Sequence, residues 1–430
     1  MSNRRNFLKK SVAFASLSFF PSSLISQLKN SRLRTAHIGV GGMGGADLNS
    51  ISSHKLVDVV ALCDVDSNAL DKAKKLHPNA KVFSDYRKLF NEISDSIDAV
   101  IVSTPDHTHA PASMMAMNIR KSVYCQKPLT HHVSEAREMK KLAEDNNLVT
   151  QMGIQIHSFD EYKSAVILIQ SGIIGKVSTV RAWSPKNWGY DGPEPEGSDP
   201  IPANLDWNLW LGTAKKRPYK DKIYHPGQWR KLLDYGCGTL GDMGVHIFDT
   251  PYAALDLDVP NTVKNECRKS NGFGHPEHNK VSYVFPGTRY TKESLKWVWY
   301  DGDGAPKKHK DLILPNDEKL PDQGAIFIGD KGRLLLPHWD FPKLIVNGKY
   351  EKLDYPKLDK SDHYHQFVDA CLGKDKCSTP FSYASRLTET ILLGVIAGRF
   401  PNKVLHWNNE NAKFSEEEAN KFLESKYRDF

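Results

Sequence analysis

The sequence predicts an α/β protein in which a doubly wound parallel sheet precedes an α+β domain with a large, open, mostly antiparallel sheet. From Thr35 to about Gly153, short β-branched apolar runs alternate with helix-like segments, the rhythm of parallel strands joined by covering helices. A glycine-rich turn directly follows the first run. Beyond Gly153 apolar residues alternate with polar ones in period two, which is typical of antiparallel strands with one solvated face.

The size and composition of the chain fit this two-domain prediction. The chain has 430 residues, of which 40% are apolar and 25% are charged, so it can bury a substantial core. The composition excludes a disordered chain, and no apolar stretch approaches the ~20 residues of a membrane span.

Residues 1–30 are predicted to form a leader rather than part of the fold. They contain five basic side chains and no acidic one, and Arg4-Arg5 precedes a short apolar run over 12–20. This order resembles a twin-arginine signal, so we expect export to the periplasm. No clear cleavage site follows, which leaves both removal and retention as an anchor open. Without these charges the net charge of +7 falls to +2, and a nucleic-acid partner is no longer indicated.

Three segments are predicted to follow the leader. In residues 31–155 the expected strands are 36–40, 57–63, 99–103, 122–125 and 148–152, with helices that include 68–76 and 134–145. Residues 156–383 are expected to begin with a helix over 159–170 and to contain strands 177–183, 262–268, 280–285, 295–300 and 325–336. Residues 384–430 are expected to be C-terminal helices that pack back on the body, chiefly a helix over 385–399.

The turn after the first strand, Gly39-Val40-Gly41-Gly42-Met43-Gly44, satisfies the pattern G-x-G-x-x-G. In such a turn the glycines permit the tight bend, the approach of a pyrophosphate and the close packing of the next helix. Asp64 ends the next strand twenty residues after Gly44, where a carboxylate accepts hydrogen bonds from an adenosine ribose. We therefore predict a Rossmann dinucleotide site that includes Gly42 and Met43. Asp64 and Asp66 would repel the 2′-phosphate of NADP, so NAD is favoured.

Two later strands also end in polar motifs, at the edge where open α/β sheets bind ligands. They are Ser103-Thr104-Pro105-Asp106-His107-Thr108-His109 and Cys125-Gln126-Lys127-Pro128. Together with the glycine turn and Gly241-Asp242-Met243-Gly244-Val245-His246, they make the chain resemble the Gfo/Idh/MocA oxidoreductases over nearly its whole length after the leader. The resemblance implies that Ser103, Thr104, His107 and Lys127 bind the nicotinamide cofactor.

Members of that family oxidise or reduce a hydroxyl or keto carbon of a sugar or cyclitol, and the resemblance implies a catalytic set of Lys127, Asp242 and His246. Gln126 stands where the family has a glutamate. Independently, residues 242 and 246 would share one helix face, so that Asp242 could hold the imidazole tautomer while the other nitrogen takes the hydroxyl proton. Lys127 could polarise the developing carbonyl. The alternatives are a solvated lysine and a structural histidine.

Residues that suit a sugar ring combine indole faces for its C–H groups with polar groups for its hydroxyls. The predicted substrate contacts are Gln155, His157, Trp183, Asn187, Trp188, His225, Trp229 and Arg230. Each tryptophan has the alternative of being a core residue. Histidine pairs at 107/109, 131/132 and 363/365 form no recognised zinc motif, so no metal site is predicted.

The leading functional prediction is an exported NAD-dependent dehydrogenase that acts on the CH–OH group of a sugar, glycoside or cyclitol. The first alternative is a glycosidase that keeps NAD tightly bound and works by oxidation, elimination, hydration and reduction. The second is a sugar-binding relative without catalysis. Steady NADH production favours the dehydrogenase, whereas glycoside cleavage without net NADH favours the glycosidase. The apolar run Trp297-Val298-Trp299-Tyr300 on an open sheet also predicts a homo-oligomer formed across that face.

Overall fold

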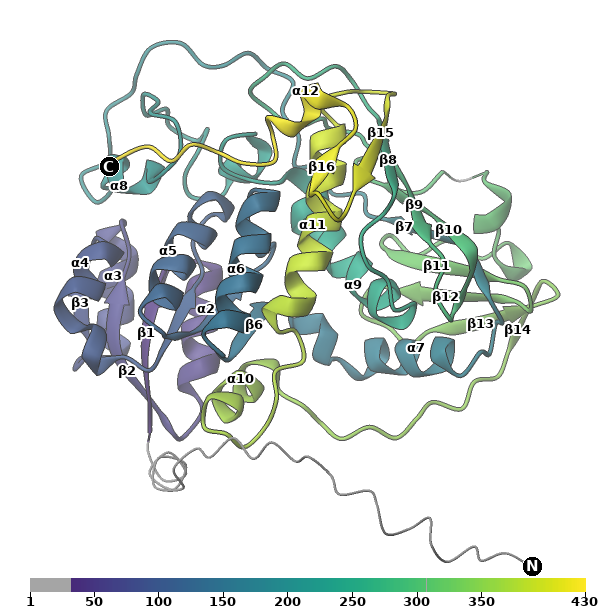
Figure 1. Cartoon of the computed structure of the whole chain (residues 1–430), viewed down its shortest axis with the longest axis horizontal. Coiled ribbons are helices and arrows are strands. Elements are labelled where there is room, and N and C mark those ends of the chain that lie inside the picture. Colours follow the sequence, from purple (N-terminus) through teal and green to yellow (C-terminus); the bar gives the residue numbers. More distant parts are fainter. Residues whose placement is uncertain (1–31, 307) are drawn as a thin grey trace, which may run out of the picture.

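The computed structural model describes residues 32–306 and 308–430, which form two sheets with a long helix between them (Figure 1). The predicted leader, residues 1–30, lies outside the described residues. The first sheet has six parallel strands in the order β3-β2-β1-β4-β5-β6, the order of a doubly wound dinucleotide-binding fold. Its strands are β1 (Leu33–Ile38), β2 (Val57–Cys63), β3 (Lys81–Phe83), β4 (Ala99–Val102), β5 (Ser122–Gln126) and β6 (Thr150–Gly153).

Helices connect these strands and cover the sheet. They are α2 (Met43–Ser52), α3 (Ser67–Leu76), α4 (Tyr86–Ile93), the short η1 (Ser94–Ser96), α5 (Asp106–Asn118) and α6 (Val133–Asp145). The carboxylates of Asp66 and Asp85 cap α3 and α4 by accepting backbone N–H bonds in the first turn. In contrast, the N-cap of α2 is Gly42, and no side chain caps this helix. Among the described residues, no side-chain cap therefore competes with a ligand for the N-terminus of α2.

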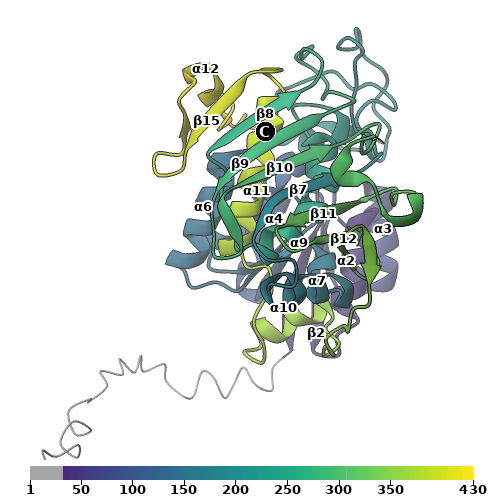
Figure 2. The same cartoon turned by 90° about the vertical axis from the view of Figure 1, so that its right-hand side faces the viewer.

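The second sheet has ten strands in the order β14-β13-β12-β11-β7-β10-β9-β8-β15-β16, and it faces the viewer in Figure 2. All its neighbouring strands are antiparallel except β7 and β10. The predicted fold class is confirmed. The strands are β7 (Val177–Trp183), β8 (Thr262–Glu266), β9 (Lys280–Pro286), β10 (Thr291–Tyr300), β11 (Gly324–Gly329), β12 (Arg333–Pro337), β13 (Lys343–Val346), β14 (Lys349–Glu351), β15 (Val404–Asn408) and β16 (Lys413–Phe414).

The remaining helical elements surround this sheet and join it to the first. They are η2 (Gln155–Ser158), α7 (Asp160–Gln170), α8 (Trp207–Leu211), η3 (Gln228–Lys231), η4 (Leu240–Gly244), α9 (Val245–Ala254), η5 (Lys310–Leu312), η6 (Pro315–Asp317), α10 (His363–Cys371), α11 (Phe381–Ala397) and α12 (Glu417–Asn420). Helix α9 packs on the inner face of the sheet, where Phe248 stacks on Trp297 at 4.3 Å between ring centroids. This packing places the start of α9 between the two domains.

Two predicted elements differ in the structure. The strand expected over 325–336 is a hairpin of β11 and β12, because Gly329-Asp330-Lys331-Gly332 makes a turn inside an otherwise apolar run. The segment 384–430 is not purely helical. After α11 it supplies β15, which pairs with β8, and its last helix has only four residues. The sequence of β15 did not predict this strand, because its partner β8 lies about 140 residues earlier in the chain.

A buried ionic cluster ties α11 to both domains. The carboxylate of Glu389 is fully buried and accepts hydrogen bonds from Arg137 of α6, Arg386 of α11 and the indole of Trp407 in β15. Each of these partners comes from a different part of the fold or a different turn of the helix. Glu389 thus links the first domain, the central helix and the second sheet.

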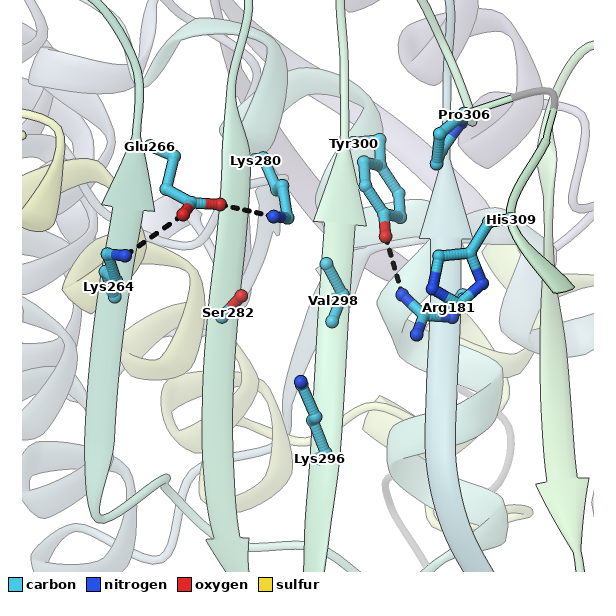
Figure 3. Close-up of a pocket in the computed structure, with 10 residues that line it drawn as sticks. All are labelled: Arg181, Lys264, Glu266, Lys280, Ser282, Lys296, Val298, Tyr300, Pro306 and His309. Atoms are coloured by element: carbon cyan, nitrogen blue, oxygen red, sulfur yellow. Dashed lines mark hydrogen bonds and ion pairs between the residues drawn. The ribbon is translucent and has the colours of Figure 1, made fainter. Parts of the chain in front are cut away.

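The outer face of the second sheet is not the open apolar surface that the sequence predicted. Trp297 and Trp299 point to the core, while Val298 and Tyr300 are covered by Leu312 and Leu314 of the segment that follows β10. The uncovered part of the face is a hollow of about 510 Å³ lined largely by polar and basic side chains (Figure 3). Among them, Lys264 and Lys280 flank Glu266, and Arg181 bonds the hydroxyl of Tyr300.

Candidate active site

The glycine turn after β1 has the tight geometry that its sequence requires. Gly39 has a φ of 80°, and a Cβ there would lie 2.7 Å from the carbonyl oxygen of Ser103 at the end of β4. A Cβ on Gly44 would lie 2.1 Å from the carbonyl oxygen of Gly39. By contrast, nothing lies within 4 Å of the Cβ position of Gly42. The turn therefore packs closely against the sheet and leaves open space at the start of α2.

The carboxylate of Asp64 lies at the end of β2 beside this turn. It accepts backbone N–H bonds from Val40 at 2.8 Å and from Asp66 at 2.9 Å, and its burial raises its pKa. Each oxygen retains a lone pair after these bonds. A carboxylate at this place and an uncapped helix N-terminus fit the ribose and pyrophosphate of a dinucleotide.

Lys127 and Asp242 form a buried ion pair where the two domains meet. Lys127 directly follows β5, and its ammonium donates to the Asp242 carboxylate at 2.8 Å and to the Asp242 carbonyl at 3.0 Å. The same carboxylate accepts the indole N–H of Trp188 at 2.6 Å and lies 3.4 Å from the guanidinium of Arg230. Burial alone would raise the pKa of Asp242, but Lys127 and Arg230 hold it well below its usual range. Asp242 is therefore an anion that fixes the position of the Lys127 ammonium.

His246 lies near this pair but does not have the partner that the sequence predicted. No hydrogen bond joins it to Asp242 in the described part of the chain, and its buried Nδ1 has no partner there. Asp242 lies in η4, a π-helical turn whose wider spacing alters the angle between side chains four residues apart, and its oxygens bond Lys127 and Trp188 instead. Burial and the nearby Lys127 charge lower the pKa of His246 well below its ordinary value. The imidazole is thus neutral at pH 7.

The sequence did not indicate a second buried carboxylate, that of Asp106, which interacts with the charges of Arg230 and Lys127. Asp106 begins α5, is buried, and accepts the backbone N–H of Cys237 at 3.1 Å. Burial raises its pKa to about 7, although Arg230 and Lys127 oppose that rise. In the sequence, Asp106 stands between Pro105 and His107 of the T-P-D-H-T-H motif. An aspartate there gave little signal, because aspartate is common in the first turn of any helix.

A second group, an Asp–His pair between η2 and α9, contains a predicted substrate residue, His157, but its pairing was not predicted. The imidazole Nδ1 of His157 contacts both carboxylate oxygens of Asp249 at 2.9 and 3.0 Å, and Asp249 also accepts the hydroxyl of Tyr383. Burial opposes protonation of His157, but the Asp249 charge outweighs it and raises the pKa of the imidazole. The signals in the sequence were the place of His157 after β6 and that of Asp249 on the helix of His246.

Five of the predicted cofactor and substrate residues have polar contacts with neighbouring groups. Arg230 reaches Asp242 as described, and Gln155 donates to the hydroxyl of Tyr364 at 2.9 Å. Ser103 donates to the carboxylate of Asp47 at 2.6 Å. Thr104 lies in the same loop, and its carbonyl contacts the ring of His109. Asn187 is exposed and accepts the backbone N–H of Gly189.

Three other predicted residues have packing contacts instead. Trp183 alternates to the outer face of β7, where its indole bonds the carbonyl of Pro321, so it points away from α9. Trp229 lies in an aromatic cluster and donates to the carbonyl of Pro226. His107 is buried with both ring nitrogens against carbonyl oxygens, those of Tyr235 and Trp210. Trp183 and Trp229 are thus buried, as the core alternative for each tryptophan expects, and their contact with substrate stays a prediction.

His225 lies at the opposite end of the predicted cofactor site from the Lys127–Asp242 pair. Its Nε2 is 3.3 Å from the carboxylate of Asp66, two residues after Asp64, and Asn204 donates to the same carboxylate. The segment around Asn204 also forms backbone bonds to Val65 and Ser67. The second domain therefore reaches the adenosine end of the predicted cofactor site, where His225 and Asn204 contact Asp66. Among residues 32–306 and 308–430, no three His, Cys, Asp or Glu side chains are grouped as metal ligands would be.

Comparison with known proteins agrees with this fold. A family model described as the Gfo/Idh/MocA oxidoreductase family, NAD-binding Rossmann fold, matches residues 33–154. A second model, for the C-terminal α/β domain of the same family, matches residues 160–288. The chain belongs to the Gfo/Idh/MocA oxidoreductase family. The two matches together cover more than half of the chain and meet close to the end of β6.

Curated relatives are oxidoreductases by name. The uncharacterized oxidoreductase YdgJ of Escherichia coli is 29% identical over 78% of this chain and 88% of its own length. The D-xylose 1-dehydrogenase [NADP(+)] of Haloarcula marismortui is 22% identical over 66% of this chain and 67% of its own length. The inositol 2-dehydrogenase of Rubrobacter xylanophilus is 28% identical over 35% of this chain. The match spans only 37–46% of the length of that enzyme and of three uncharacterized oxidoreductases.

Solved structures share the fold at low sequence identity. The aldose-aldose oxidoreductase from Caulobacter crescentus, complexed with glycerol, aligns with a TM-score of 0.60 at 14% identity, over 87% of this chain and 99% of that one. The WlbA dehydrogenase from Bordetella pertussis, in complex with NADH and UDP-GlcNAcA, aligns with a TM-score of 0.61 at 13% identity, over 88% and 99%. These likenesses establish the two-domain fold of this chain.

Proposed function

We propose that this chain is an NAD-dependent oxidoreductase that transfers hydride between nicotinamide and a hydroxyl or keto carbon of a sugar, glycoside or cyclitol. The observation that carries the proposal is the buried Lys127–Asp242 pair, which the second domain closes over the carboxyl edge of a dinucleotide-binding sheet. The family membership of the chain supports it. The named activities of two relatives, on D-xylose and on inositol, support the carbohydrate class.

In this proposal each residue of the site has a separate role. A bound nicotinamide would supply or accept the hydride. The ammonium of Lys127, fixed by Asp242, polarises the oxygen of the reacting carbon. His246, whose pKa is lowered by burial, is neutral and accepts the hydroxyl proton. Trp188 and Arg230 hold the Asp242 carboxylate, so that Lys127 keeps its orientation.

NAD is proposed over NADP because two carboxylates, Asp64 and Asp66, lie where the 2′-phosphate of NADP would have to bind. Titration of the purified protein with NADH and NADPH, followed by nicotinamide fluorescence, tests this preference. We expect NADH to bind at least about tenfold more tightly, because an unpaired buried charge costs more than a kcal/mol or two. Equal binding of the two cofactors would contradict the assignment of Asp64.

The activity is tested by following NADH formation with a panel of sugars, glycosides and cyclitols. Lys127→Ala and His246→Ala should each lose at least about a hundredfold in kcat, the usual contribution of a positioned acid or base. Lys141→Ala and His406→Ala are matched controls, because both side chains are exposed and paired with surface carboxylates. Undiminished activity in the Lys127 and His246 variants would refute the site. Glycoside cleavage without net NADH would instead identify the redox-neutral glycosidase, and binding without turnover the non-catalytic relative.

Export by a twin-arginine signal is proposed from residues 1–30. Replacing Arg4 and Arg5 by lysine in the full chain should keep the protein in the cytoplasm, and fractionation of expressing cells measures it. Unchanged export would exclude the twin-arginine route.

Assembly into a homo-oligomer through the second sheet is also proposed. The exposed part of that face is rich in lysine, so a partner copy would have to bring acidic groups to it (Figure 3). Lys296→Glu, which reverses the charge of one lysine that lines the hollow, should then reduce the mass measured by light scattering. A monomeric wild-type protein would refute the proposal.

A further inference from the structure

Gln126, which stands where the family has a glutamate, has a buried carboxylate as its partner. The side-chain amide of Gln126 donates to both oxygens of Asp47, at 2.9 and 2.8 Å. Both side chains are buried, with Asp47 at 0% and Gln126 at 4% exposure. Asp47 lies in α2, one turn after the glycine-rich turn, and 79 residues separate the two in sequence. The carboxylate missing from the end of β5 is thus present on the neighbouring helix.

Asp47 holds more than Gln126. Its carboxylate also accepts the hydroxyl of Ser103, at the end of β4, and the hydroxyl of Tyr364 from α10, at 2.6 and 3.0 Å. The Tyr364 hydroxyl in turn accepts the amide of Gln155. One buried carboxylate therefore joins α2, the ends of β4 and β5, and a helix from the C-terminal half. Two of these segments carry residues predicted to bind cofactor, Ser103 and Lys127.

The position of Gln126 is sterically determined. A Cβ on Gly153, the residue paired with Gln126 across β5 and β6, would lie 2.8 Å from the Gln126 amide nitrogen. The side-chain oxygen Oε1 of Gln126 accepts the backbone N–H of Lys127 at 3.3 Å. Gln126 thus connects Asp47 on one side with the backbone of Lys127 on the other.

We propose that Asp47 and Gln126 are a matched pair that positions Lys127, with the negative charge moved from the strand end to α2. This inference rests on the proposed role of Lys127 in hydride transfer. Two carboxylates at 2.8 Å cannot both be ionised in a buried site, so a glutamate at position 126 is incompatible with Asp47. An asparagine at position 47 is compatible with a glutamate at 126, because an amide then faces one carboxylate again.

The pairing is tested with Asp47→Asn, Gln126→Glu and the double variant that exchanges the two groups. We expect each single variant to bind NADH about tenfold more weakly. Asp47→Asn takes the charged anchor from Ser103 and the end of β5, whereas Gln126→Glu sets a second carboxylate against Asp47. The double variant should recover binding to within about twofold of wild type. The labelling rate of Lys127 by an amine-acylating reagent, measured by peptide mass spectrometry at one pH, should change in the single variants and recover in the double one.

A control separates positioning from general stability. Tyr364→Phe removes one hydrogen bond to Asp47 and keeps the carboxylate, so it should lower the melting temperature without changing the labelling rate of Lys127. Failure of the exchanged pair to restore both NADH affinity and Lys127 labelling, in a protein that melts as wild type does, would refute the proposal. Neither readout needs turnover. A catalytically dispensable Lys127 would therefore refute the proposed function while these measurements still decide the pairing.

Discussion

Replacing Lys127 by methionine should destabilise the folded protein at pH 7 because it removes the main partner of a buried anion. Lys127 and Asp242 are 15% and 11% exposed at the side chain and meet at 2.8 Å. Breaking a buried pair by removing one partner typically costs about 3–5 kcal/mol. Here Trp188, at 2.6 Å, and Arg230, at 3.4 Å, still compensate Asp242. We therefore expect a loss of about 2–3 kcal/mol, below the typical range.

A double-mutant cycle isolates this interaction. Asp242→Asn alone leaves the Lys127 ammonium facing Arg230 without the anion, and it should also destabilise the protein. Lys127→Met combined with Asp242→Asn removes both charges, so its cost should fall short of the sum of the single costs by about 2 kcal/mol. Thermal and urea unfolding of the apo protein, with two probes to check for a single transition, measure the four free energies. Additive effects would refute the coupling.

The pH dependence gives an independent check of the same pair. In the wild type the pKa of Asp242 is depressed, so the stability it confers is present above its unfolded pKa and is lost only as the pH falls through the lower folded value. In Lys127→Met the burial remains without the ammonium, so the pKa of Asp242 should rise. The penalty should then be larger at pH 8 than at pH 5, where the carboxyl takes up a proton. A penalty that grows toward low pH would contradict the charge assignment.

Three further perturbations test other parts of the structure. Gly44→Ala places a Cβ 2.1 Å from a backbone oxygen, so it should lower the free energy of unfolding by about 1–3 kcal/mol and weaken NADH binding. Melting curves and fluorescence titration measure the two effects, and a wild-type melting temperature would contradict the close packing of α2. Burial raises the pKa of Asp106 to about 7, so its ionisation opposes folding and stability falls as the pH rises from about 4 to 7. Asp106→Asn should therefore gain up to about 4 kcal/mol over wild type at pH 8.5 but little at pH 4, seen in melting curves at both pH values. Glu389→Ala should lower the free energy of unfolding by about 3 kcal/mol, because it leaves Arg137 and Arg386 without their shared carboxylate. Glu424→Ala, on the exposed tail, is the control and should leave the melting curve unchanged.

Much of the first domain was predictable because its signals are local. The run 57–63 was predicted with the bounds of β2, and the glycine turn and Asp64 have the geometry expected from their spacing. Strand β3 was missed because its three residues are mostly exposed and carry no apolar pattern. The hairpin of β11 and β12 was missed because its turn interrupts a nearly continuous apolar run.

The candidate site was predictable only in part, because its contacts join residues that lie far apart in the sequence. Lys127 and Asp242 were both identified, yet their direct pairing was not, because 115 residues separate them. The predicted helix-face pairing of Asp242 and His246 is wrong, since a π-helical turn and two stronger donors compete for the carboxylate. Trp183 and Trp229 were attractive as sugar contacts by residue type, but strand alternation and an aromatic cluster bury them elsewhere.

The sequence by itself determined the two kinds of sheet, the dinucleotide turn and the chemical types present at the strand ends. Those properties follow from periodicity and from backbone requirements that a few neighbouring residues satisfy. Only the tertiary structure decided which groups meet: Asp47 with Gln126, Trp188 with Asp242, and His157 with Asp249. A buried carboxylate accepts hydrogen bonds from the donors that the packing brings within about 3 Å of it. Which donors these are depends on segments far apart in the chain.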